Sequence, residues 1–153
     1  MNEADKAKEG VMDKEKDGRK RILIVEDDEP LARLVKARLE SAGYDVNMEV
    51  KGLTALALAA RERFDLVILD VNLPDSDGFQ IARDLRRGYH PWALPILMLT
   101  VKSQPVDRLR GFAHGADAYL TKPFDSLELF ETVSFLLGEA MWESGSSAGG
   151  QPK

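Results

Sequence analysis

Residues 67–78, VILDVNLPDSDG, decide the fold class of this chain. The stretch continues an apolar run over 66–69, reaches the carboxylate of Asp70, and passes into a turn rich in Asp, Pro and Gly. A short, continuous apolar run is typical of a buried parallel strand. A carboxylate directly after such a strand lies at the edge of the sheet where open α/β folds bind their ligands.

Three further apolar runs lead into polar side chains of related chemistry. The run over 22–25 is followed by Glu26-Asp27-Asp28, and the run over 96–99 ends in Thr100. The run over 118–120 leads to Lys122, which Pro123 and Phe124 follow. Acids, a hydroxyl and an ammonium group at successive strand ends predict one site for a divalent metal and a phosphoryl group.

Segments with helical periodicity separate the apolar runs. We predict helices that span 31–39, 53–63, 78–87, 105–112 and 125–140, and a wetter strand over 44–50. This alternation predicts an α/β domain with a doubly wound, five-stranded parallel sheet in the order 2-1-3-4-5 and five helices, as in flavodoxin-like folds. The strand order then reverses beside the first and third strands, so Glu26, Asp27 and Asp70 meet in one crevice.

Composition narrows the class of protein. The net charge of −5 and the pI near 5.1 argue against direct nucleic-acid binding, which usually needs a basic face. The chain has no cysteine and no apolar stretch that could span a membrane, and its start lacks the apolar core of a signal peptide, so we expect a cytoplasmic protein. We expect a disordered charged leader over 1–20, a domain over 21–141 and a flexible Gly/Ser-rich tail over 142–153.

The residue types at the strand ends suit phosphoryl transfer. Carboxylates that meet in one crevice repel each other unless a cation joins them. Oxygen ligands without His or Cys favour Mg²⁺. The carboxylate of Asp70 could attack phosphorus, and Thr100 and Lys122 could bind the phosphoryl oxygens.

Four blocks carry a family resemblance: ILIVEDD at 22–28, VILDVNLPDSDG at 67–78, MLT at 98–100 and GADAYLTKPF at 115–124. Over roughly residues 21–140 the chain resembles the receiver (CheY-like) domain of two-component response regulators. The resemblance implies a signalling switch rather than an enzyme. It implies that Asp70 takes a phosphoryl group from a histidine kinase or a histidine phosphotransfer protein, and that Thr100 and Lys122 hold the phosphoryl oxygens. It implies Mg²⁺ ligation by Glu26, Asp27, Asp70 and the backbone carbonyl of Asn72.

The resemblance also implies how the switch works. Phosphorylation draws Thr100 inward, and the aromatic ring of Tyr119 rotates into the space that opens. This remodels the face formed by the fourth helix, the fifth strand and the fifth helix, which binds an output partner that the sequence does not identify. The resemblance further implies a cis Lys122–Pro123 peptide bond. We expect a monomer or a weak dimer.

Several polar residues have ordinary structural interpretations. We expect Asp28 to be solvated or to cap a helix, and Asp75 and Asp77 to shape the turn and cap the helix that Gly78 opens. His90 and His114 are interpreted as surface histidines.

The chain departs from the family pattern at two places. Val101 stands where the family usually has a small residue, so we expect slow loading from small phosphodonors; a Val101→Ala variant that loads no faster would contradict this. The winged-helix class of response regulators usually has a second acid where this chain has Ala118, and basic residues in the last helix. Residues 125–141 contain no Lys or Arg, so we expect no charge-paired dimer of that class.

Three other functions compete with a phosphorylated switch. A pseudo-receiver would bind partners without phosphorylation. A haloacid-dehalogenase-type phosphatase also uses a strand-end Asp, but it needs an acid where this chain has Asn72. A flavodoxin-like cofactor protein needs a phosphate-binding loop after the first strand, where Glu26, Asp27 and Asp28 would repel the phosphate of FMN.

Overall fold

A computed structural model of the chain describes residues 18–88 and 93–139. Most of the leader predicted over 1–20, His90, and the tail predicted over 142–153 lie outside the described residues. Within the described residues, no helix has the length and apolar character needed to cross a membrane.

The predicted sheet is confirmed: five parallel strands lie in the order β2-β1-β3-β4-β5. The strands are β1 (Arg21–Val25), β2 (Asp45–Glu49), β3 (Leu66–Leu69), β4 (Ile96–Thr100) and β5 (Ala118–Thr121). Every residue of β1, β3 and β4 is buried, as their continuous apolar runs predict, whereas only Val46 is buried in β2. The carboxyl ends of β1, β3 and β4 therefore meet at one edge of the sheet.

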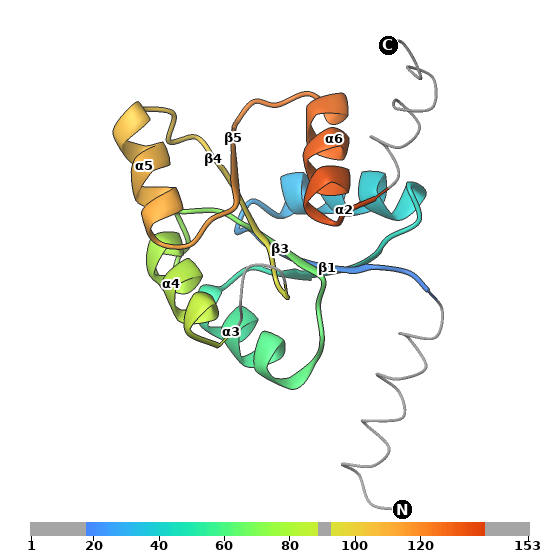
Figure 1. Ribbon diagram of the computed structural model, residues 1–153, viewed down its shortest axis with the longest axis horizontal. Helices are drawn as coiled ribbons and strands as arrows, with labels where there is room; N and C mark the ends of the chain where they lie inside the picture. Colours follow the sequence, from blue (N-terminus) through green and yellow to red (C-terminus); the bar gives the residue numbers. More distant parts are fainter. Residues whose placement is uncertain (1–17, 89–92, 140–153) are drawn as a thin grey trace, which may run out of the picture.

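In the described residues, four helices connect the strands, a fifth follows β5, and together they cover both faces of the sheet. They are α2 (Glu29–Ser41), α3 (Gly52–Arg61), α4 (Gly78–Gly88), α5 (Pro105–Ala113) and α6 (Ser126–Leu136). Figure 1 shows α2 and α6 on one face and α3, α4 and α5 on the other. This is the doubly wound arrangement that the alternation of strands and helices predicts.

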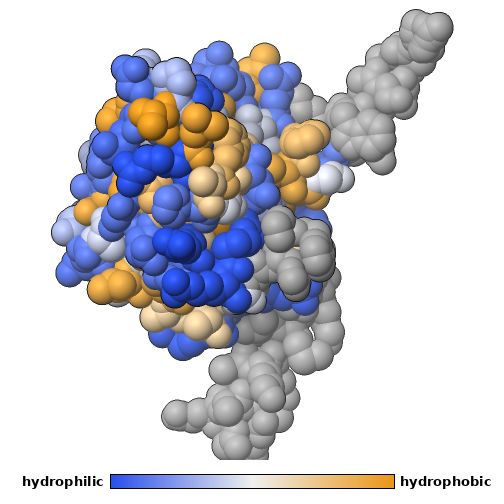
Figure 2. All heavy atoms as spheres, turned by 60° about the vertical axis from the view of Figure 1, so that its left-hand side comes forward, coloured by the Kyte–Doolittle hydropathy of each residue, from blue (hydrophilic) through white to orange (hydrophobic). Residues whose placement is uncertain are grey.

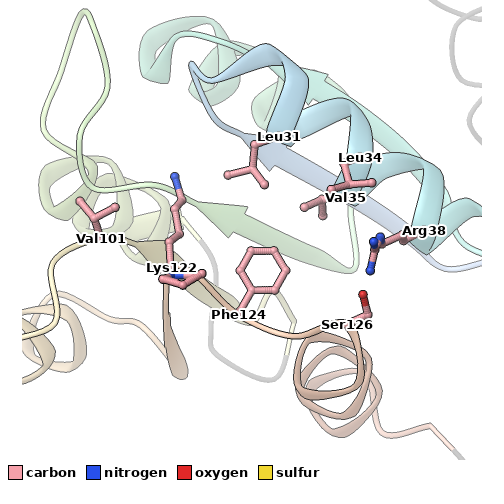
Figure 3. A pocket seen from close by; sticks show the side chains of 9 residues that line it. Leu31, Leu34, Val35, Arg38, Val101, Lys122, Phe124 and Ser126 are labelled. Carbon is pink, nitrogen blue, oxygen red and sulfur yellow. The ribbon is translucent and has the colours of Figure 1, made fainter.

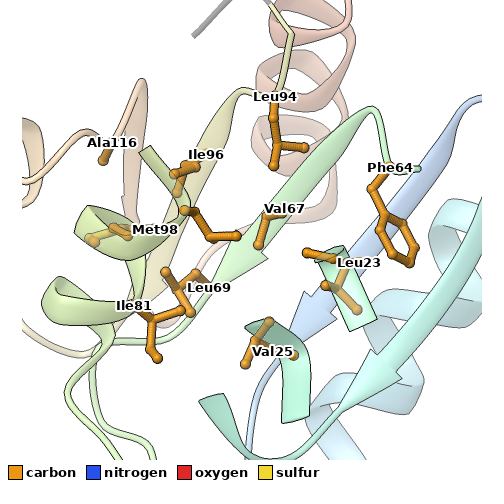
Figure 4. Close-up of a cluster of buried hydrophobic side chains, with 14 of the residues drawn as sticks. Leu23, Val25, Phe64, Val67, Leu69, Ile81, Leu94, Ile96, Met98 and Ala116 are labelled. Carbon is orange, nitrogen blue, oxygen red and sulfur yellow. The ribbon is translucent and has the colours of Figure 1, made fainter. Parts of the chain in front are cut away.

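Two hydrophobic clusters form the core, one on each face of the sheet. The first joins side chains of β1, β3 and β4 to α3 and α4, and Figure 4 shows Leu23, Val67 and Ile81 among its members. The second joins the opposite side of the strands to α2 and α6, with Leu39, Leu129 and Val133 almost fully buried. This burial fixes the strand ends on which the polar residues stand.

The last helix is shorter than predicted, because α6 ends at Leu136 and not near residue 140. Gly138 adopts a positive φ of 67°, which favours glycine. Its N–H donates to the carbonyl of Phe135 at 3.1 Å, and the N–H of Glu139 donates to that of Ser134 at 2.8 Å. These bonds close the helix in the manner of a glycine C-cap, which the periodicity of the apolar residues alone does not reveal.

Candidate functional site

The ends of β1 and β3 bring three carboxylates together. Val25 pairs with Leu69 in the sheet, so Glu26 and Asp70, the next residues, lie side by side. The N–H of Asp70 donates to the carbonyl of Val25 at 3.0 Å. Carboxylate oxygens of Glu26, Asp27 and Asp70 lie within 4.8 Å of one another. Glu26 and Asp70 are 4% and 6% exposed, whereas Asp27 is exposed to solvent.

Lys122 reaches this acidic cluster from the loop after β5. Its Nζ lies 2.6 Å from Oε1 of Glu26 and 3.1 Å from Oδ2 of Asp70, although these residues are far apart in the sequence. Its backbone N–H donates to the carbonyl of Thr100 at 2.8 Å, which fixes the loop to the end of β4. The Lys122–Pro123 peptide bond is cis, as the resemblance implies.

The charges of the cluster do not balance. Burial, reinforced by the negative charge of Asp70, raises the pKa of Glu26 to about 7 despite its hydrogen bond to Lys122. Burial lowers the pKa of Lys122, but the hydrogen bond to Glu26 and the charge of Asp70 outweigh it and raise that pKa overall. One ammonium group among three carboxylates leaves negative charge that a divalent cation with oxygen ligands would neutralise.

Thr100 and Asn72 complete the predicted set at the same edge of the sheet. Thr100 ends β4, is fully buried, and accepts a long hydrogen bond of 3.4 Å from the N–H of Lys102. Asn72 lies in the loop after β3, where its N–H donates to Oδ1 of Asp70 at 3.2 Å and its backbone forms an antiparallel bridge with Asp77. The carboxylate of Asp70 is therefore linked directly to the loop that follows it.

Tyr119 is buried in the structure. Its hydroxyl donates to the carbonyl of Lys102 at 2.7 Å, and burial raises its pKa. The guanidinium of Arg108 lies 5.2 Å from the ring centroid and donates to the carbonyl of Tyr119 at 3.3 Å. The hydrogen bond to Lys102 and the contact with Arg108 thus hold the ring inside the fold.

The capping aspartates have separate roles. Asp28 caps α2, because its Oδ1 accepts from the N–H of Leu31 at 3.1 Å, and Asp77 accepts from the N–H of Phe79 at 2.9 Å, both as predicted. The prediction for Asp75 is wrong. Its carboxylate accepts from the N–H groups of Gly52 and Leu53, at the start of α3 and not of α4.

An apolar groove of about 390 Å³ adjoins the acidic cluster. Figure 3 shows Lys122 and Val101 at one end and Arg38 and Ser126 at the other, with Phe124 between them. Leu31, Leu34 and Val35 of α2 form the opposite side. Val101 is 61% exposed, so its branched side chain stands at the surface next to Lys122.

Sequence reasoning missed the contacts that join the site to more distant elements. The hydrogen bond between Tyr119 and the Lys102 carbonyl has no local signature in the sequence. The contact of Asp75 with α3 has one indirect sign. Lys51 stands at the N-cap of that helix, where Ser, Thr, Asp or Asn is usual, so the cap had to come from elsewhere.

Comparisons with known proteins agree on one family. A family model described as the response regulator receiver domain matches residues 22–134. The DNA-binding dual master transcriptional regulator RpaA of Synechocystis sp. is 47% identical over 117 residues, which cover 76% of this chain and 48% of that protein. The chain thus spans about half the length of this relative.

Solved structures give the same result. The chemotaxis protein CheY4 of Vibrio cholerae is 36% identical with a TM-score of 0.72, covering 78% of this chain and 99% of that one. The receiver domain of the sensor histidine kinase PA1611 of Pseudomonas aeruginosa is 32% identical with a TM-score of 0.72, covering 79% of this chain and 99% of that one. That structure holds a magnesium ion coordinated in its active-site cleft.

Proposed function

The chain belongs to the response regulator receiver domain family of two-component systems. We propose that it is a phosphorylation-dependent switch and that Asp70 is the phosphoryl acceptor. One observation carries the proposal: the nearly buried Asp70 lies among two further carboxylates and the ammonium group of Lys122. Nearly buried carboxyl groups with a raised pKa such as that of Glu26 are enriched at functional sites.

The donor set fits Mg²⁺. The carboxylates of Glu26, Asp27 and Asp70 and the backbone carbonyl of Asn72 would hold the ion, because it prefers hard oxygen ligands. The bound ion would neutralise charge on the incoming phosphoryl group. The raised pKa of Glu26 supports this assignment, since the folded protein holds that carboxylate at a cost that a cation would remove.

The remaining residues position the phosphoryl group. An Oδ atom of Asp70 forms a bond to phosphorus while the P–N bond of a phosphohistidine donor breaks, and the electron pair of that bond stays on the imidazole nitrogen. Lys122 already contacts Asp70, so its ammonium group can bind a phosphoryl oxygen without a large movement. Thr100 offers its hydroxyl from the end of β4. Such a reaction depends mainly on positioning and charge neutralisation.

We assign the partners from the same family. The donor would be a histidine kinase or a histidine phosphotransfer protein, and the output partner would bind the face formed by α5, β5 and α6. We further propose that residues 21–141 form the receiver domain, that it acts in the cytoplasm as a switch and not as an enzyme, and that the flanking segments stand outside it.

Intact mass after phosphorylation tests the function directly. The protein is incubated with Mg²⁺ and acetyl phosphate or phosphoramidate, and we expect a gain of one phosphoryl group that requires Mg²⁺. An Asp70→Ala variant should show no gain. Asp28→Asn is the matched control, because it changes a neighbouring carboxylate that caps α2 and should leave the gain intact.

The alternative is a pseudo-receiver that works without phosphorylation. Absence of any mass gain, together with no response of the protein to beryllofluoride, would favour it over our proposal. A gain that persists in Asp70→Ala would also contradict the proposal, because another residue would then accept the group.

A further inference from the structure

Helix α3 begins without a capping side chain of its own. Lys51 occupies its N-cap and makes no side-chain hydrogen bond to the helix. The N–H of Gly52 donates instead to Oδ1 of Asp75 at 2.8 Å, and the N–H of Leu53 donates to Oδ2 at 3.0 Å. Both oxygens of one carboxylate are therefore used to join the loop after β3 to a helix more than twenty residues earlier in the chain.

The negative charge of the Asp75 carboxylate suits its position at the start of α3. The start of a helix carries unpaired N–H groups and a partial positive charge, and both stabilise a carboxylate. The hydrogen bonds from Leu53 and Gly52 lower the pKa of Asp75, and burial opposes them. The hydroxyl of Ser76 donates to the same carboxylate at 3.1 Å. Asp75 is therefore ionised at neutral pH and held in one place.

The loop and the helix also pack too closely for a side chain at position 52. A Cβ atom on Gly52 would lie 2.2 Å from Oγ of Ser76 and 2.8 Å from Cγ1 of Ile81. At the other end of the loop, a Cβ on Gly78 would lie 2.2 Å from the carbonyl oxygen of Asp70. The loop is thus held against β3 at Gly78 and against α3 at Asp75.

Asn72 lies in this loop between the end of β3 and Asp75, and the loop returns to β3 at Gly78. Its backbone bridges to Asp77, and its N–H donates to the carboxylate of Asp70. Because a backbone carbonyl has no rotamer of its own, its position depends entirely on how the loop is held. Without the bonds of Asp75 to α3, the loop would keep only its attachments to β3, and that carbonyl would sample a wider range of positions.

We propose that Asp75 is a positioning residue, whose two hydrogen bonds to the start of α3 fix the loop that presents the Asn72 carbonyl to Mg²⁺. The inference rests on the proposed function, since it assigns a role in the same metal site. Residues that orient metal ligands from outside the ligand set typically change affinity by about tenfold or more when they are substituted. We expect an effect of about tenfold here.

Calorimetric titration of Mg²⁺ into the full chain measures this effect without phosphorylation. We expect Asp75→Ala to bind Mg²⁺ about tenfold more weakly than the wild type, and Asp75→Asn to fall between them, because an amide can accept only one of the two bonds. Ser76→Ala is the matched control. It removes the hydrogen bond from Ser76 to the same carboxylate but keeps both bonds to α3, so its loss of affinity should be clearly smaller than that of Asp75→Ala.

A simple charge effect must be separated from positioning. Removing a carboxylate near the site weakens cation binding through space, but at about 1 M salt the Debye length is only about 3 Å and that contribution is largely screened. The loss in Asp75→Ala should persist at high salt if the loop position is responsible. Equal weakening of the Asn and Ala variants that disappears at high salt would overturn the proposal.

Amide hydrogen exchange supplies a second readout that a merely structural role would not change. The N–H groups of Gly52 and Leu53 should exchange more slowly in wild-type protein when Mg²⁺ is added, because coupling between two sites acts in both directions. In Asp75→Asn this response to Mg²⁺ should be reduced, even if Asp75→Ala fails to fold. Unchanged exchange on metal binding would count against the link.

The outcomes separate this inference from the proposed function. If the wild type binds Mg²⁺ and both Asp75 variants bind it equally well, only the positioning role is wrong. If the wild type binds no Mg²⁺, both the proposed metal site and the positioning role are wrong.

Discussion

At the scale of single residues, the raised pKa of Glu26 would couple the proposed metal binding to pH. Its pKa is raised from 4.5 to about 7, so the folded protein keeps a proton that the unfolded chain releases at lower pH. The stability that this proton contributes is complete below the pKa of the unfolded chain and is lost as the pH rises through about 7. Without metal, the free energy of unfolding should therefore fall over this interval.

Magnesium at the proposed site should reverse this loss, because it would bind the ionised carboxylate of Glu26. We expect Mg²⁺ to raise the melting temperature more at about pH 8 than at about pH 5.5, where Glu26 is mostly protonated. Thermal unfolding in Mg²⁺ and in EDTA at both pH values measures the difference. A Glu26→Gln variant provides the control, since it cannot titrate. An equal stabilisation by Mg²⁺ at both pH values would contradict the prediction.

Residues differ in how far sequence alone predicts their contacts. Asp28 and Asp77 bond to N–H groups two or three residues away, so their roles follow from local turn and cap patterns. Asp75 also resembles a turn residue, but its partners lie in another helix. Arg21 is only 2% exposed, and its side chain contacts Glu62 and the carbonyl of Arg63. Contacts of this kind depend on tertiary packing and have no local signature.

At the scale of elements, α5 has a glycine where it meets Tyr119. A Cβ on Gly111 would lie 2.9 Å from Cδ2 of Tyr119 and 3.2 Å from Sδ of Met98. The ring can occupy its buried position against α5 only because this side chain is absent. A side chain at position 111 would therefore press against the ring of Tyr119.

Gly111→Ala should shift Tyr119 outward and bring its pKa down toward its ordinary value of 10.0, because burial is the main cause of its raised pKa. A pH titration of the tyrosine ring carbons by NMR measures this, with the Tyr119 signal identified from Tyr119→Phe. Gly88→Ala is the matched control, since a Cβ there meets no atom within 4 Å. An unchanged titration of Tyr119 in Gly111→Ala would show that α5 moves instead of the ring.

The two ends of α6 differ in how well the local sequence predicts them. The start of α6 follows from Asp125, whose Oδ1 accepts from the N–H of Glu128 at 2.7 Å as a local cap pattern predicts. The end of α6 does not follow from its periodicity. The amphipathic pattern continues past Leu136, whereas the positive φ of Gly138 stops the helix. Periodicity indicates which elements exist more reliably than where they end.

At the scale of the whole molecule, topology explains why the site could be predicted. Strand order and the rule that ligands bind at the carboxyl ends of parallel strands place Glu26, Asp70, Thr100 and Lys122 at one edge before any contact is known. The ion pairs of Lys122 and the inward position of Tyr119 needed the structure, because the conformation of long side chains depends on neighbours from other elements.

The surface of the molecule also indicates how it would associate with a second copy of itself. Figure 2 shows the side that carries α4 and α5, where hydrophobic side chains form separate patches between hydrophilic ones. Within the described part of α6 there is no Lys or Arg, and Phe135 is 76% exposed. The arginines of α5 are engaged within the molecule: Arg108 contacts Tyr119, and Arg110 lies 4.4 Å from the ring centroid of Phe79. The described part of α6 therefore offers no cation that could pair with an acid of a second copy.

We therefore expect the protein activated with beryllofluoride to remain a monomer or to form a weak dimer that is insensitive to salt. Sedimentation velocity at about 0.1 M and about 1 M salt measures this, since ion pairs across an exposed interface weaken as screening increases. Phe135→Ser should weaken any dimer that forms, because apolar contact would then be its main source of affinity. A tight dimer that dissociates at high salt and tolerates Phe135→Ser would contradict this prediction, because ion pairs would then hold the two copies together.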